Sequence, residues 1–198
     1  MPALDIAALK AQQDAFLARR AALLDRFVPF WNGLIERLTA FTSDALAAGL
    51  VDVRECHLRP NYGETGVAEV MLNGFNLLLV ATDETNHLDA PNGPIAARVL
   101  IYPHDQPDAQ PTGDFLAREL NGETYQVQGR FFGVEQNRAF FSGDVSLEHG
   151  REAADALIRL IYSLHLLWEE RPMLGIALDR DTPTGSIGFR PPSSNGPE

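Results

Sequence analysis

The segment from residue 66 to residue 82, GVAEVMLNGFNLLLVAT, constrains the fold more than any other part of the chain. Asn73 and Gly74 form the dipeptide preferred in a two-residue type I′ turn, because both positions of that turn need positive φ. The runs on either side should therefore pair as antiparallel strands. Their register puts three apolar pairs on one face, which we expect to line the core: Leu72 with Phe75, Val70 with Leu77 and Ala68 with Leu79. The opposite face is mixed, with Glu69, Met71, Asn76 and Leu78.

The rest of residues 51–144 consists of short apolar runs separated by turn residues, which predicts further strands. These runs are VDVRECHL, IAARVLIY, ETYQVQGRFF and RAFFSG. Residues 114–122, DFLARELNG, allow two structures. Asp114 could cap a short helix, or Asn121 and Gly122 could turn a second hairpin. We favour the hairpin, because the strand-like run ETYQVQ follows directly.

Both flanks of this region have helical periodicity. Residues 3–48 are expected to be helical, either as one kinked helix or as two helices, because Pro29 lacks an amide proton. Gly49 predicts the helix end, with the glycine left-handed and Leu50 folding back. A second helix is expected over residues 148–171. Its apolar stripe contains Leu157, Leu160, Ile161, Leu164, Leu167 and Trp168.

Helices at both ends with consecutive strands between them predict an α+β fold. We expect an antiparallel β-sheet of about five to seven strands, with the N-terminal and C-terminal helices packed on one face. The chain of 198 residues is long enough for one domain with a core, which we assign to residues 1–172. Residues 173–198 should hold an edge strand in MLGIAL and then a flexible tail.

Charge and composition exclude several classes of function. A formal net charge of −11 disfavours binding to nucleic acid or to an anionic membrane surface. Lys10 is the only lysine and lies outside any glycine-rich loop, which excludes a P-loop and disfavours Schiff-base chemistry. Asp5 and Asp14 interrupt the region where a signal peptide would be apolar. A single cysteine allows no internal disulfide, so we expect a cytoplasmic protein.

Cys56 and His57 are adjacent and invite comparison with a catalytic thiol–imidazole pair. If residues 51–58 form a strand, these neighbours point to opposite faces and cannot act together. We therefore expect Cys56 to be a small buried apolar residue. None of the five histidines has the spacing of a zinc site, so we expect neither a metal nor a cofactor.

Two hypotheses of function follow. In overall layout and charge the predicted protein resembles the small acidic secretion chaperones, which have helices flanking an antiparallel sheet and dimerise, although no motif is shared. The first hypothesis is a non-catalytic binding protein that uses a leftover apolar face for a protein partner or a second copy in a homodimer. The alternative is a small-molecule-binding or small enzymatic domain with a pocket in the curve of the sheet. Its polar groups would come from Tyr102, His104, Tyr125 and Arg130.

Overall fold

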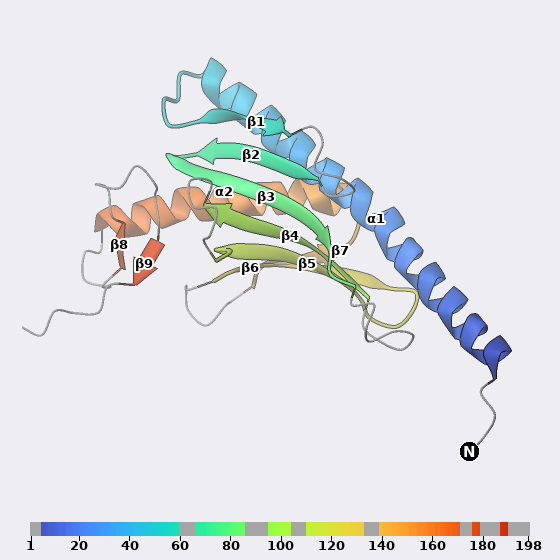
Figure 1. The fold of residues 1–198 in the computed structure, drawn as a ribbon. Coiled ribbons are helices and arrows are strands. Elements are labelled where there is room, and N and C mark those ends of the chain that lie inside the picture. Colours follow the sequence, from blue (N-terminus) through green and yellow to red (C-terminus); the bar gives the residue numbers. More distant parts are fainter. Residues whose placement is uncertain are drawn as a thin grey trace, which may run out of the picture.

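The computed structural model describes residues 5–59, 66–85, 95–103, 110–132, 139–170, 176–178 and 187–189, with side chains up to Ser163. Seven strands follow one another along the chain and pair in that same order to form one antiparallel sheet. They are β1 (Arg54–Leu58), β2 (Val67–Leu72), β3 (Phe75–Asp83), β4 (Ala96–Pro103), β5 (Gly113–Glu119), β6 (Tyr125–Phe131) and β7 (Ala139–Asp144). Helix α1 (Ile6–Ala47) precedes the sheet and α2 (Leu147–Glu170) follows it. Both lie on one face (Figure 1), which confirms the predicted α+β fold.

The hairpin of β2 and β3 has the predicted turn and register. Asn73 and Gly74 have φ of 50° and 81°, as a type I′ turn requires. The three predicted apolar pairs are opposed in the sheet. Five of their six side chains are buried, and Phe75 is partly buried against the same core. Local turn chemistry therefore fixes which face of these strands enters the core.

Residues 114–122 form a hairpin, as we favoured. Strand β5 pairs with β6, and the Leu120 amide donates to the Thr124 carbonyl at 2.9 Å, which leaves a three-residue loop. Gly122 has a φ of 83°. The Asn121 side-chain oxygen accepts from the Thr124 amide at 3.0 Å. The turn is thus one residue longer than the two-residue Asn-Gly turn of the first hairpin, although it has the same dipeptide.

Helix α1 is a single helix that continues through Pro29, which answers the question that the sequence left open. It ends as predicted, with Gly49 at a φ of 84°. The amide of Leu50 donates to the Ala45 carbonyl and that of Gly49 to the Leu46 carbonyl, each at 3.0 Å. These two bonds make a Schellman motif, which satisfies carbonyls that the helix end would otherwise leave exposed.

The two helices run in the same direction and touch through a pair of glycines. A Cβ atom on Gly33 of α1 would lie 2.1 Å from the backbone oxygen of Leu147, and one on Gly150 of α2 would lie 2.1 Å from that of Phe30. Only glycine permits so close an approach of two helix backbones. Further along, the rings of Phe41 and Tyr162 meet edge to face. The helices therefore form one continuous layer behind the sheet.

The apolar stripe of α2 packs into the core over the part of the helix whose side chains are described. Leu157 and Ile161 are buried, whereas the side chains of Leu164, Leu167 and Trp168 lie outside the described residues. No helix in the described part of the chain combines the length and the apolar character needed to cross a membrane.

The C-terminal segment departs from the expected edge strand. Residues 176–178 do form a strand, β8 (Ile176–Leu178), but it pairs with β9 (Ile187–Phe189) in a separate two-stranded sheet. The partner strand β9 is a short β-prone run inside the segment that the sequence pattern assigned to a flexible tail. The flexibility predicted for the remaining residues after 172 falls largely outside the described part of the chain.

Candidate functional site

One face of the seven-stranded sheet has no helix over it in the described structure (Figure 1). We call this side the outer face; alternate residues of each strand form it, because successive side chains point to opposite sides. Its central strands carry a group of large apolar side chains that are partly exposed. These are Met71, Leu78, Val80, Leu100, Tyr102 and Leu116. The register aligns Leu78 with Tyr102 and Val80 with Leu100, so the group is contiguous across β3 and β4.

A cluster of charges borders this apolar group. Asp114 is fully buried, and Arg130 donates to both of its carboxylate oxygens, at 2.9 and 2.5 Å. The Arg98 Nε atom lies 3.2 Å from the same carboxylate, and a terminal nitrogen of Arg98 lies 3.7 Å from Glu84. The hydrogen bond with Asp114 raises the pKa of Arg130. Two acids and two bases therefore neutralise one another, and the cluster braces β4, β5 and β6 together.

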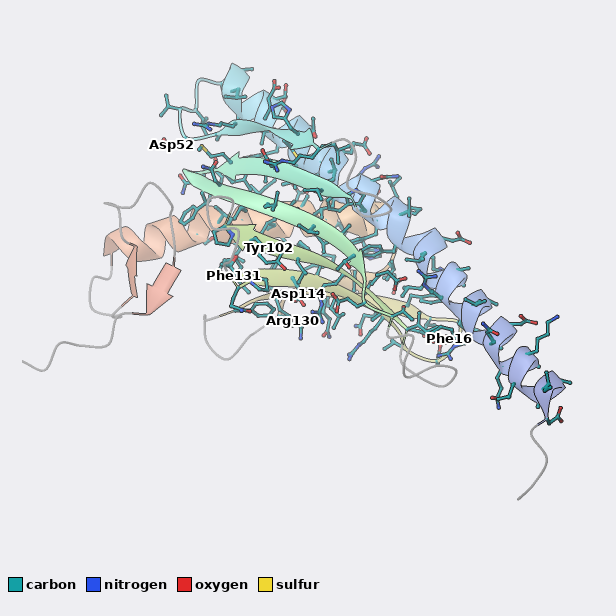
Figure 2. The ribbon with its side chains drawn as sticks, in the orientation of Figure 1. Phe16, Asp52, Tyr102, Asp114, Arg130 and Phe131 are labelled. Atoms are coloured by element: carbon teal, nitrogen blue, oxygen red, sulfur yellow. The ribbon has the colours of Figure 1, made fainter. Side chains whose placement is uncertain are left out.

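The four residues predicted for a small-molecule site do not share one location. Tyr102 and Arg130 lie on the outer face, and Figure 2 shows them gathered with Asp114 over the same part of the sheet. Tyr125 points the other way: it is 6% exposed on the helix-covered face, with the Arg26 guanidinium 5.0 Å from its ring centre. His104 lies outside the described residues. Residues an odd number of positions apart in one strand project from opposite faces, and Tyr125 and Arg130 are five positions apart in β6.

Cys56 and His57 point to opposite faces, as predicted. Cys56 is 6% exposed toward the helices, and its amide donates to the Thr42 hydroxyl at 3.2 Å. Burial raises the pKa of the Cys56 thiol to about 11, against a smaller lowering by a hydrogen bond with Thr39. His57 is exposed and opposes Glu69 on β2. The two side chains therefore cannot form a nucleophile–base pair.

The outer face is hollowed at its β1 end, a feature that the sequence did not indicate. The register between β1 and β2 shifts between Arg54 and His57, and a pocket of about 250 Å³ lies there. Its lining is mainly polar and comes from β1, β2 and β3: Arg54, Glu55, His57, Glu69, Val70, Met71, Asn76 and Leu77. This pocket is thus slightly smaller than the usual ligand pocket, which measures about 300–1,000 Å³. A β-bulge depends on how two strands pair, so neither strand's own pattern reveals it.

Among the residues whose side chains are described, no three of histidine, cysteine, aspartate and glutamate are grouped so that they could hold a metal ion. Comparison with known proteins gives no further guide: no protein-family model, no curated protein and no solved structure matches this chain. The outer face, with its apolar centre, charged border and small polar pocket, is therefore the candidate site on physical grounds alone.

Proposed function

We propose that this protein is a non-catalytic binding protein that docks a protein partner on the outer face of its sheet. The observation that carries the proposal is the contiguous apolar group on β3 and β4, centred on Leu78, Leu100 and Tyr102. Apolar side chains that project from a sheet lose contact with water when a partner covers them, and each such burial favours association.

The pairing of titratable groups supports binding over catalysis. Catalytic groups commonly combine a shifted pKa with access to a substrate. Here Asp114 is enclosed by arginines, and Glu119 and Asp83 at strand ends pair with Arg19 and Arg20 of α1. These carboxylates hold elements together. Each of these carboxylates is paired with an arginine of the same chain, so it is less available to bind a substrate or to transfer a proton.

The outer face carries charges of both signs. Arg98 and Arg130 pair with Asp114, and Glu69 projects from the same face. Arg54 and Arg118 are exposed on it as well. We expect a partner surface that is apolar at its centre and carries both acidic and basic groups at its rim, because complementary charges speed encounter and fix orientation.

Site-specific photo-crosslinking tests the proposal. A photoreactive amino acid at position 100 should capture a specific partner in cells, and the same amino acid at position 159 should not. Arg159 is the matched control, since it is exposed on the far side of α2. Capture at position 100 should be lost when Leu78 is replaced by Asp. Equal capture at both positions, or none at position 100, would contradict the proposal.

The polar pocket beside β1 supports a second candidate, a small polar ligand bound at His57 and Asn76. A thermal-shift screen with metabolites and divalent ions separates the two candidates, because a bound ligand raises apparent stability by mass action. A hit that is lost in His57→Ala and kept in Leu100→Asp would favour the pocket.

For either candidate we propose a cytoplasmic location, which a single cysteine supports.

A further inference from the structure

The bulge in β1 brings onto the outer face two polar side chains that a regular strand would divide between its faces. Arg54 and His57 are three positions apart, and an odd spacing sends the side chains of a regular strand to opposite sides. The register instead pairs Arg54 with Met71 and His57 with Glu69, so two residues of β1 lie opposite one residue of β2. Both side chains therefore line the pocket of about 250 Å³.

Most polar side chains of this pocket lack partners within the described part of the chain. Four of them form no hydrogen bond or ion pair with another described residue: Arg54, Glu55, His57 and Asn76. Glu69, in contrast, is paired with Arg59. Elsewhere on the outer face, Arg98 and Arg130 share Asp114. A few polar groups that converge on a concave site are typical of ligand pockets, where they fix the orientation of the ligand.

The charges of these groups indicate the chemical class of the ligand. Arg54 is positive and Glu55 is negative, and a ligand that covers the pocket removes water from both. A charge that loses water without gaining a partner is unfavourable. An anion would leave Glu55 without a partner, and a cation would leave Arg54 without one. A zwitterion satisfies both, because its carboxylate can pair with the guanidinium and its ammonium with the Glu55 carboxylate.

The volume of the pocket limits the size of this zwitterion. A water molecule takes about 30 Å³ in the liquid, so the pocket of about 250 Å³ holds about eight non-hydrogen atoms. The α-amino acids with short side chains have this size. Met71 lies between Arg54 and Asn76 across the three strands, and it offers an apolar surface to the carbon atoms of such a ligand.

We propose that this pocket binds a free α-amino acid with a short side chain. Arg54 holds the carboxylate and Glu55 the ammonium, while His57 and Asn76 complete the hydrogen bonds. The three residues from β1 are exposed, so the ligand can reach them from solvent. The inference rests on the pocket that is the second candidate of the proposed function, and it names the ligand of that pocket. It does not depend on docking at Leu100.

Isothermal titration calorimetry with the full chain tests the class of ligand. The probes are glycine, alanine, serine, threonine and aspartate, each compared with its α-amide and its N-acetyl form. The amide lacks the α-carboxylate and the N-acetyl form lacks the ammonium. We expect at least one amino acid to bind, and both of its derivatives to bind at least about tenfold more weakly. Equal affinity for the amino acid and for either derivative would overturn the proposal.

Two substitutions at exposed positions of β1 test the role of each charge. Arg54→Gln should weaken binding of the amino acid at least about tenfold, but should not weaken binding of the amide further, because the amide has no α-carboxylate to pair. Glu55→Gln should act in the same way on the amino acid and the N-acetyl form. The matched control is Arg118→Gln, which removes an exposed arginine from another part of the outer face and should leave the affinity unchanged.

The result can be separated from that of the docking proposal. Circular dichroism should show that Arg54→Gln and Glu55→Gln stay folded. No binding of any probe at millimolar concentration would overturn the amino-acid proposal, as would undiminished binding in Arg54→Gln. Photo-crosslinking at position 100 reports docking independently. Leu100→Asp should keep the affinity for the amino acid, because Leu100 is not part of the pocket lining.

Discussion

At the scale of single residues, Asp114 shows how a buried charge is held in place. Its carboxylate is fully buried, whereas the Arg98 and Arg130 side chains are 28% and 31% exposed. In Asp114→Ala both cations stay close together without an anion between them. We expect a loss of about 2–4 kcal/mol in the free energy of unfolding, below the upper range for fully buried pairs because water reaches the arginines. Urea denaturation measures it, and the exposed Arg118→Gln is the control; equal midpoints for the two variants would contradict the prediction.

Cys56 should react slowly with iodoacetamide in the native protein. Burial raises its thiol pKa from 9.0 to about 11, and only the thiolate reacts. The raised pKa alone should slow alkylation at neutral pH by about a hundredfold relative to the unfolded chain, and poor access should slow it further. Mass spectrometry over time, with the urea-unfolded protein as the control, measures both rates. Similar rates in the two states would show that the thiol is exposed.

The ion pair of Asp83 and Arg20 should make stability depend on pH in a narrow acidic range. Burial alone would raise the pKa of Asp83, but hydrogen bonds from Thr85 and the contact with Arg20 outweigh it, so the pKa lies below the ordinary 3.8. A lowered folded pKa adds stability that is complete above the unfolded value and is lost as the pH falls through the folded value. Arg20→Gln should therefore be less stable than wild type at neutral pH, by less than about 1 kcal/mol. Urea midpoints should converge below pH 3.8; a constant difference would contradict the assignment.

At the scale of elements, the crossing of α1 and α2 depends on Gly33 and Gly150. Alanine normally stabilises a helix relative to glycine by about 1 kcal/mol. Here the added Cβ would meet a backbone oxygen at 2.1 Å, so the helices would have to separate. We expect Gly33→Ala and Gly150→Ala each to destabilise the protein by about 1–3 kcal/mol. Thermal unfolding measures this, with the exposed Ala11→Gly as the control for helix propensity; a rise in melting temperature in either glycine variant would show that the helices do not touch there.

The elements that could be predicted from the sequence are those that local chemistry determines. Alternation and the turn at Asn73 and Gly74 fix β2 and β3, and the three- and four-residue periodicity fixes both helices. Pairings that bring distant segments together could not be predicted. In β7, Phe141 lies opposite Gly129 and Ala139 opposite Arg130, which leaves Phe140 as an extra, bulged residue. Strict alternation would put Phe140 and Phe141 on opposite faces, whereas both rings contact Phe115.

The candidate site was only partly predictable for the same reason. The sequence indicated a mixed face on β2 and β3, and that face is the outer face of the sheet. It could not show that β4 to β6 extend this face, because their order in the sheet is a tertiary property. The buried position of Asp114 also depends on tertiary structure, since Arg98 and Arg130 come from the two flanking strands.

At the scale of the whole molecule, the extent of the folding unit gives a last prediction. The described core runs from Phe16 to Ile161, all within the domain that we assign to residues 1–172. A chain truncated after residue 172 should therefore keep its urea midpoint and its m value, because the m value scales with the surface exposed on unfolding. Circular dichroism during urea titration of the truncated and full-length chains measures both. If β8 and β9 pack on the core, the truncated chain will expose less new surface and its m value will fall, and the domain boundary must then move toward the C-terminus.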